Sequence, residues 1–278
     1  MDRPFAGRTA AVATKHGKEA VLRAALEPVG LAVVVADVDT DRFGTFTGEV
    51  PRKGSPHEVA ERKARAAIAA SGHDVGIGSE GSFGPHPSAP FVTADVEVLV
   101  LVDARVGMVV AEEAMSLATA AAGRPVVPGE ELGPWLERVG FPSQALICRP
   151  ADASPRCITK GIVDRSALEQ AVARAAGASR DGRAVVETDL RAHLCPTRRA
   201  VIAAAGDRLA ARLARRCPVC STPGFGQVGV ELGRPCGRCG VATSEVVATV
   251  MGCGACRQTR REAVGGPADP SCCPWCNP

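Results

Sequence analysis

The chain has 278 residues and is 46% hydrophobic, enough to bury the core of one large domain or of a medium domain with an appendage. Its 33 basic and 30 acidic residues leave a net charge of +3, which excludes a general binder of polyanions and requires any phosphate site to be local. The longest apolar run, 96–102, is too short to span a bilayer, and the first ten residues lack the apolar centre of a signal peptide. We therefore expect a cytoplasmic protein with no membrane partner.

A strand is expected at residues 8–13, followed by a turn and a helix that ends near residue 26. The turn contains Thr14, His16 and Lys18, whose hydroxyl, imidazole and ammonium groups suit a phosphate bound at a helix N-terminus. An ordinary capped helix with a solvated basic turn would contain the same residues. A second strand, 31–38, ends at Asp39 and Asp41, which we expect to close a turn.

The next helix has a clear start signal. Ser55 can cap it, Pro56 suits its first position and Glu58 completes a capping box. Apolar residues between positions 59 and 68 recur at helical spacing, so one face of the helix should be buried.

Two glutamates flank this helix and mark a candidate site. Glu49 precedes it beside a glycine, and Glu80 follows a short buried strand, 74–78, in a polar, glycine-rich turn with Ser79 and Ser82. Open α/β sheets bind ligands where core strands end. With Lys63 on the helix, the two carboxylates provide what a metal-assisted phosphate site requires. A tight turn with a solvated glutamate would also explain Glu80.

Strands continue to alternate with helices up to residue 213. Residues 91–103 and 105–110 should pair as long antiparallel strands, so the sheet is mixed. Helices are then expected at 111–122, 130–139, 164–175 and from 196, with strands at 145–149, 157–162 and 184–188. This alternation predicts an α/β domain over residues 1–213.

A polar segment precedes the last helix. Asp189, Arg191 and His193 lie close together there, and Thr197 and Arg198 follow. These residues could complete a cleft or clamp the C-terminal tail, and a plain helix-capping turn would contain the same residues.

Five short motifs occur in the order seen in inosine/xanthosine triphosphatases, and the chain resembles that family over roughly residues 8–200. The motifs are Thr14-Lys15-His16-Gly17-Lys18, Gly48-Glu49, Lys63-Ala64, Ser79-Glu80-Gly81, and Thr159-Lys160-Gly161 with Arg165. The resemblance implies the inosine-triphosphatase-like (ITPase-like) fold, shared with Maf proteins, in which an elongated mixed sheet is split into two lobes. It also implies a homodimer.

In that family a purine nucleoside triphosphate lies between the lobes, and Mg²⁺ held by acidic residues helps water to release pyrophosphate. Carried over, the resemblance implies catalytic roles for Glu49, Glu80 and Lys63, with both glutamates as Mg²⁺ ligands. The candidate substrate-binding residues are Thr14, His16, Lys18, Ser79, Ser82, Lys160, Arg165, His193 and Arg198. A late His-Arg motif corresponds either to His193 or to Thr197-Arg198. The chain departs from the family in His16, where asparagine is usual, and in Glu80, where aspartate is frequent.

The cysteines indicate a second module at residues 214–278. Of the twelve, eight form four C-x2-C pairs: Cys217 and Cys220, Cys236 and Cys239, Cys253 and Cys256, and Cys273 and Cys276. In a reducing cytosol eight thiolates predict two tetrahedral Zn²⁺ sites. So short a segment with few large apolar side chains needs metal to fold, so the zinc is structural.

The pairing of the four motifs is open. The segment from Cys236 to Cys256, with a strand at 245–250 between its two C-x2-C motifs, resembles a complete zinc ribbon. We therefore favour a nested arrangement, in which the second and third motifs share one zinc site and the first and last motifs share the other. Pairing in sequence order is the alternative. Cys272 could replace Cys273, whereas Cys148, Cys157 and Cys195 are expected to be buried or incidental.

Zinc ribbons often bind nucleic acid, but from Cys217 onward five arginines accompany four acidic residues, with only Phe225 and Trp275 to stack on bases. We therefore expect a structural or protein-docking module, with nucleic acid as the less favoured partner.

Taken together, the sequence predicts a Mg²⁺-dependent hydrolase of a nucleoside triphosphate, non-standard purines included, with a double-zinc appendage. The alternative is a non-enzymatic protein that binds a nucleotide or RNA in the same cleft and a partner through the zinc module. The whole chain also resembles a bacterial family that joins such a domain to a cysteine-rich end.

Overall fold

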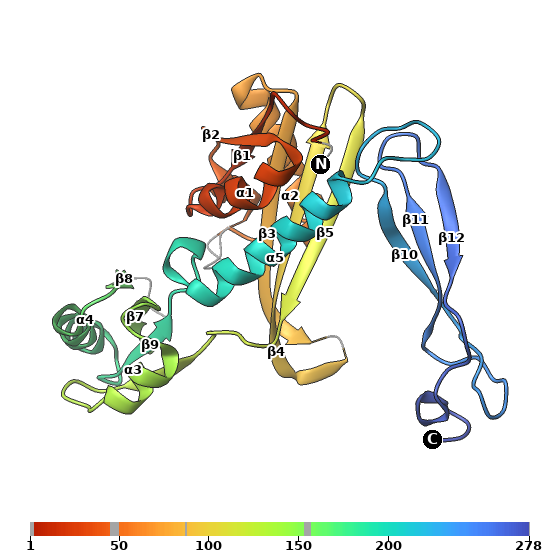
Figure 1. Cartoon of the computed structure of the whole chain (residues 1–278). Coiled ribbons are helices and arrows are strands. Elements are labelled where there is room, and N and C mark those ends of the chain that lie inside the picture. The colour runs from red at the N-terminus through yellow and green to blue at the C-terminus, as the bar shows by residue number, and fades with distance from the viewer. Residues whose placement is uncertain (1–2, 45–49, 87, 153–156, 278) are drawn as a thin grey trace.

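The structure, a computed structural model, describes residues 3–44, 50–86, 88–152 and 157–277. In these ranges the chain forms three parts, which we call lobe 1, lobe 2 and the arm (Figure 1). Lobe 1 is built on a five-stranded sheet, lobe 2 on a four-stranded sheet and the arm on a three-stranded sheet. The predicted class, a mixed two-lobed α/β domain followed by a cysteine-rich module, is confirmed.

The sheet of lobe 1 has the strand order β2-β1-β3-β4-β5. Its strands are β1 (Arg8–Ala13), β2 (Leu31–Ala36), β3 (Val75–His86), β4 (Ala89–Asp103) and β5 (Met108–Ser116). β1 runs parallel to β2 and β3, whereas β4 runs antiparallel to both β3 and β5, so the sheet is mixed as predicted.

Three helices cover this sheet: α1 (Lys18–Leu26), α2 (Pro56–Ser71) and α5 (Pro196–Leu213). α1 and α5 lie on one face, where Leu22 and Ile202 join Leu101 in the main core. α2 covers the other face, where Ala60 packs with Val98.

The close approach of α2 to β3 sets the position of Lys63. The predicted capping box is present, since the Glu58 amide donates to Ser55 Oγ and the Ser55 amide donates to the Glu58 carboxylate at 2.7 Å. A Cβ on Gly78 would lie only 1.8 Å from the Ala60 carbonyl oxygen, so glycine is needed where the helix crosses the strand.

Two predicted elements differ from the structure. Residues 79–85, expected as a turn, continue β3 to His86 and stay paired with β4. Residues 111–116 of the expected helix 111–122 belong to β5, because pairing along β4 outweighs the helix propensity of their alanines and glutamates.

Lobe 2 has the strand order β6-β9-β7-β8. Its elements are β6 (Gly123–Val126), α3 (Gly133–Val139), β7 (Leu146–Pro150), β8 (Thr159–Ile162), α4 (Arg165–Ala178) and β9 (Ala184–Thr188). Trp135 and Leu168 from the two helices pack with Leu146 and Val186 in a separate core. Short 3-10 helices occur at η1 (Glu27–Val29), η2 (Thr40–Phe43), η3 (Ala192–Leu194) and η4 (Pro270–Cys272).

The arm contains the antiparallel strands β10 (Gly226–Leu232), β11 (Val246–Gly252) and β12 (Thr259–Ala263). It extends from the end of α5 and places the C-terminus at its far tip (Figure 1). Buried Arg212 fastens it to lobe 1, donating to the carbonyl oxygens of Ala111 at 3.0 Å, Gly224 at 3.1 Å and Gln227 at 3.0 Å. None of the helices in the described ranges has the length and apolarity that a bilayer crossing needs.

Candidate functional site

A pocket lies at the end of β1, between the start of α1 and β3. Four basic and two acidic side chains line it: Lys15, Lys18, Lys63, Arg198, Asp41 and Glu80. The turn after β1 supplies Lys15 and the start of α1 supplies Lys18, whereas α2 and α5 supply Lys63 and Arg198. This excess of cations suits a small anion such as a phosphate group, and we call the site the cationic pocket.

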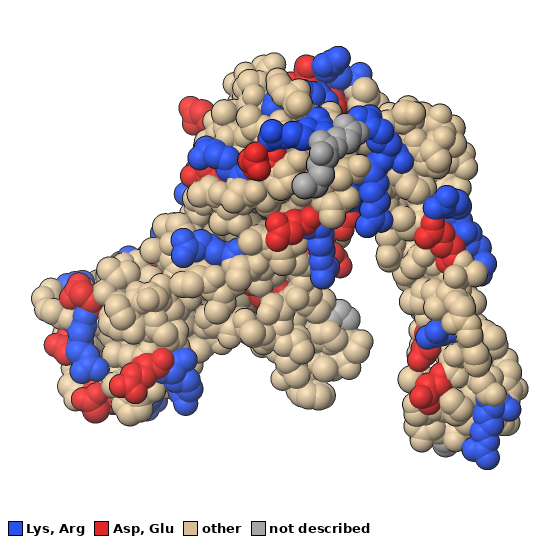
Figure 2. Space-filling model, viewed as in Figure 1, with Lys and Arg blue, Asp and Glu red and all other residues tan. Residues whose placement is uncertain are grey.

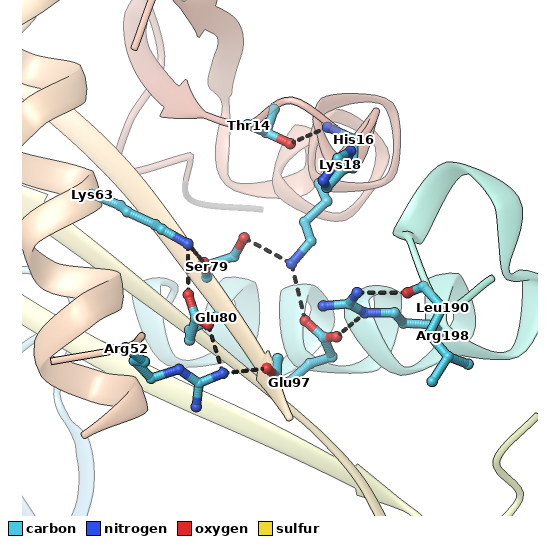
Figure 3. Close-up of polar contacts among 11 residues, drawn as sticks. Thr14, His16, Lys18, Arg52, Lys63, Ser79, Glu80, Glu97, Leu190 and Arg198 are labelled. Atoms are coloured by element: carbon cyan, nitrogen blue, oxygen red, sulfur yellow. Dashed lines mark hydrogen bonds and ion pairs between the residues drawn. The ribbon is translucent and has the colours of Figure 1, made fainter. Parts of the chain in front are cut away.

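Glu80 lies between two cations in the wall of the pocket (Figure 3). Lys63 Nζ donates to Glu80 Oε2 at 2.6 Å, and Arg52 Nη2 lies 2.8 Å from Glu80 Oε1. Arg52 also donates to the Gly81 carbonyl oxygen at 2.9 Å. A phosphate entering the pocket would compete with Glu80 for Lys63, which lines the pocket, whereas Arg52 does not line it.

A buried carboxylate on β4 joins two further cations (Figure 3). Lys18 Nζ donates to Ser79 Oγ at 3.0 Å and to Glu97 Oε2 at 3.1 Å. Arg198 donates through Nε to Glu97 Oε1 and through Nη1 to the Leu190 carbonyl oxygen at 2.6 Å. Burial lowers the pKa of Lys18 to about 8, although Glu97 opposes the shift. Burial would raise the pKa of Glu97, but Lys18 and Arg198 hold it below its ordinary value.

Two histidines meet beside the pocket. His16 in the β1–α1 turn and His193 in η3 stack with ring centroids 5.4 Å apart. Burial lowers the pKa of His16 to about 4, and the neighbouring His193 and Arg191 add to the effect. His16 is therefore neutral near pH 7 and can offer a phosphate a hydrogen bond but no charge.

Asp95 is a buried carboxylate on the same face of β4 as Glu97. It is 1% exposed, and its Oδ1 has no hydrogen-bond partner among the described residues. Burial, followed by the charge of Glu97, raises its pKa to about 7. The folded protein thus retains a proton that the unfolded chain releases near pH 4.

We expect Asp95→Asn to stabilise the protein in a pH-dependent way. Because the folded pKa is raised, the contribution of Asp95 is fully present below about pH 4 and is lost as pH rises through about 7. Asparagine avoids this loss, so the free energy of unfolding in urea should rise by roughly 2 kcal/mol at about pH 8 and hardly change at about pH 4. Asp207→Asn, at an exposed position on α5, is the control. A gain equal at both pH values would contradict the raised pKa.

The cationic pocket collects seven of the predicted site residues: Thr14, His16, Lys18, Lys63, Ser79, Glu80 and Arg198. Ser82 lies further along β3, Lys160 is exposed on β8 and Arg165 begins α4, and these three do not line it. His193 reaches the pocket only through its contact with His16. Glu49 lies outside the described residues.

Two residues at this site were not predicted. Glu97 had a signal in the sequence, because a single carboxylate in the apolar run 96–102 must find a partner if the strand is buried. Arg52 had none, since nothing in the sequence separates it from the other basic residues near α2.

Asp189 organises the segment between β9 and α5. It is fully buried and accepts hydrogen bonds from the Gly161 amide at 3.0 Å and from Arg191 Nη2 at 2.6 Å. Both partners belong to lobe 2 or to this segment, so neither of these two bonds ties Asp189 to the arm. The segment also contains His193 and Leu190, whose carbonyl oxygen accepts a hydrogen bond from Arg198.

The eight C-x2-C cysteines form two groups of four. The proximal cluster contains Cys217, Cys220, Cys253 and Cys256, and the distal cluster contains Cys236, Cys239, Cys273 and Cys276. Four sulfur pairs, Cys217–Cys256, Cys220–Cys253, Cys236–Cys276 and Cys239–Cys273, are separated by 3.8, 3.7, 4.0 and 3.6 Å. The edge of a tetrahedron with metal–sulfur bonds of about 2.3 Å is about 3.8 Å, so both groups fit a metal such as zinc.

The clusters pair alternate motifs, which corrects both the nested order and the sequential order considered above. One strand separates each motif from the next, and each strand carries the chain to the opposite end of the sheet. The first and third motifs therefore meet at one end, and the second and fourth at the other. Cys273 belongs to the distal cluster, whereas Cys272 lies exposed outside it.

Most arginines of the arm are neutralised locally. Arg234 pairs with Glu245, Arg260 with Glu262 and Arg261 with Glu231. Figure 2 shows the two charge types intermixed on this face of the arm, without a continuous basic surface. This pattern gives no support to nucleic-acid binding by the arm.

A protein family described as a domain of unknown function (DUF6671) matches residues 63–278. The match starts at Lys63 in α2 and includes Glu80, Glu97, Arg198 and all eight cluster cysteines, but not the turn that carries Lys18. No curated protein and no solved structure matches the chain.

Proposed function

The chain belongs to the DUF6671 family, and we propose that this member is a Mg²⁺-dependent hydrolase that cleaves a phosphoanhydride bond of a nucleotide in the cationic pocket. The observation that carries the proposal is that Lys18, Lys63, Arg198 and Glu80 all line one pocket. Phosphoryl chemistry needs cations to neutralise phosphate oxygens and a carboxylate to orient water. The motif order that resembles the ITPase-like proteins supports a nucleoside triphosphate as the substrate class.

Each of the pocket residues has a separate role in this reaction. Lys18 and Lys63 bind nonbridging phosphate oxygens, with a hydrogen bond from neutral His16. As the phosphate takes over Lys63, the Oε2 atom of Glu80 is freed to accept a hydrogen bond from the attacking water. Ion pairing thus keeps Glu80 neutralised until substrate arrives.

The donors also fit Mg²⁺, which usually binds one or two carboxylates and takes its remaining ligands from substrate phosphates and water. Glu80 and Asp41 both line the pocket and would hold it, with Glu49 as a further candidate. When bound, the ion would supply charge neutralisation at the phosphate oxygens.

The test is release of pyrophosphate and of phosphate from a panel of standard and deaminated nucleoside triphosphates. We expect turnover that needs Mg²⁺ and falls at least about a hundredfold in Glu80→Gln, because the water-orienting carboxylate is lost. Mg²⁺ should be omitted rather than chelated, because a chelator would also remove metal from the cysteine clusters. Glu61→Gln, at a partly exposed position on α2 where Glu61 pairs with Arg65, is the matched control and should keep full activity.

Two results would overturn the hydrolase. Equal turnover in wild type and Glu80→Gln would remove Glu80 from the reaction. Absence of turnover with every nucleotide, together with binding of a nonhydrolysable triphosphate, would establish the binding protein instead. Two observations favour that second candidate: both Glu80 oxygens are engaged by cations, and the described residues contain no metal-binding group of three or more side chains besides the cysteine clusters.

We also infer that each cysteine cluster holds one structural Zn²⁺. The support is the tetrahedral spacing of the sulfurs and the backbone amides directed at them. The amides of Val219, Arg238, Ala255 and Trp275 each lie 3.4 Å from the sulfur two residues earlier. Such amides stabilise thiolates, which are the form that binds zinc.

A further inference from the structure

Glu97 is an unusual residue for the centre of a sheet. It is fully buried on β4, where its neighbours Val98, Leu99 and Val100 belong to the hydrophobic cores. A carboxylate in such a place is costly unless it is paired and hydrogen-bonded. Glu97 does not line the cationic pocket itself.

Each oxygen of Glu97 holds one of two pocket cations. Oε2 accepts from Lys18 on α1, and Oε1 accepts from Arg198 on α5. Lys18 donates a second hydrogen bond to Ser79 Oγ. Its third N–H has no partner among the described residues. One carboxylate between two cations leaves a net positive charge in the wall of the pocket.

Gly81 provides an independent sign that this arrangement is built in. A Cβ at residue 81 would lie 2.2 Å from Glu97 Oε1 and 2.3 Å from Arg198 Nη2. The φ of Gly81 is not positive, so its backbone conformation does not demand glycine. A side chain at residue 81 would instead have to push the ends of Glu97 and Arg198 out of their present positions.

We propose that Glu97 is a positioning residue that holds Lys18 and Arg198 side by side, so that they bind one phosphate group together. This inference rests on the proposed function only in treating the pocket as a phosphate site. Glu97 also keeps Lys18 charged, because burial alone would favour the neutral amine. The charged or titratable groups that act on Lys18 are Glu97 and Asp95 on β4, Arg198 on α5, Lys63 on α2 and His16 in the β1–α1 turn.

Binding of inorganic pyrophosphate between about pH 6 and pH 9 tests the proposal without relying on turnover. Wild-type affinity should fall as pH rises through about 8, where Lys18 loses its proton. Glu97→Gln should bind about tenfold more weakly at about pH 7.5, and its affinity should fall at lower pH, since Lys18 has lost its carboxylate. Comparing variants at each pH cancels the titration of pyrophosphate itself.

Asp95→Asn is the matched control at about pH 6, where Asp95 is still protonated, because it removes a neighbouring buried carboxyl group that makes no hydrogen bond to Lys18 or Arg198 among the described residues. Its affinity at that pH should stay within about twofold of wild type. Gly81→Ala is the second variant. It displaces Glu97 and Arg198 without changing a charge, so it should weaken binding at every pH. It also serves as the test if Glu97→Gln does not fold.

The outcomes separate this inference from the hydrolase. Pyrophosphate binding that depends on Glu97, without nucleotide turnover, would support the inference and defeat the hydrolase. Wild-type failure to bind pyrophosphate would overturn it, as would a Glu97→Gln variant with wild-type affinity and pH profile.

Discussion

A chain in which Cys220 and Cys253 are both changed to serine should retain about one zinc ion, whereas a chain with Cys220 and Cys239 both changed should retain none. The first pair of substitutions damages only the proximal cluster, and the second damages both clusters. Elemental analysis of the desalted proteins measures the difference. Each possible pairing gives its own result: nested pairing predicts no zinc in either variant, and sequential pairing predicts one zinc only in the second.

The consequences for folding should differ between the clusters. Structural zinc contributes roughly 10–16 kcal/mol of apparent binding free energy, more than so small a module can replace with apolar contacts. The proximal cluster also contacts lobe 1, where the Val109 amide donates to the Gly254 carbonyl oxygen at 3.3 Å and Ala255 packs against the main core. Its loss should therefore expose amides of β5 as well as β10 and β11 to hydrogen exchange.

Loss of the distal cluster is the matched comparison. A Cys239→Ser and Cys276→Ser chain should lose protection at the tip of the arm and keep it in β5, because the structure gives no bond between the distal cysteines and lobe 1 in the described residues. Equal loss of protection in β5 for both variants would contradict separate roles for the two clusters.

The sequence predicted local features of the fold better than distant pairings. The start of α2 was correct because Ser55 and Glu58 decide it within four residues. The helix expected at 111–122 was wrong because β4, a partner separate in sequence from that segment, determines the conformation of residues 111–116. The predicted pairing of the cysteine motifs was wrong for a related reason. Only the strand at 245–250 was expected in the tail. The sequence therefore did not reveal that three strands place successive motifs at opposite ends of the sheet.

The candidate site was predictable where a residue type has few uses. Three features indicated the pocket: lysines after the first strand, a lysine on α2, and a glutamate after the next strand. The structure brings Lys18, Lys63 and Glu80 together. Lys160 and Arg165 could not be placed, because exposed basic residues in lobe 2 are compatible with many surfaces. Glu97 was visible as a charge in an apolar run, but the identity of its partners depends on how α1 and α5 cross the sheet.

Asp189→Ala should lower the stability of lobe 2 by about 3 kcal/mol, because it leaves the Gly161 amide and the Arg191 guanidinium without their buried partner. Trp135 is a suitable probe, since it is 5% exposed in the core of lobe 2. The chain has two tryptophans, and the other, Trp275, is 79% exposed in the arm. Urea unfolding followed by Trp135 fluorescence in a Trp275→Phe background therefore reports on lobe 2 alone.

The pH dependence of that loss identifies its cause. Burial would raise the pKa of Asp189, but hydrogen bonds from Arg191 and Gly161 hold it below the ordinary value. Its contribution is therefore present above the unfolded pKa of about 3.9 and is lost as pH falls through the lower folded value. The difference between wild type and Asp189→Ala should shrink in acid, whereas Asp181→Ala, at an exposed turn of the same lobe, should cost under about 1 kcal/mol. A loss that persists unchanged in acid would mean that Asp189 acts by filling space, and not as the charge that holds the Leu190 and His193 segment beside the cationic pocket.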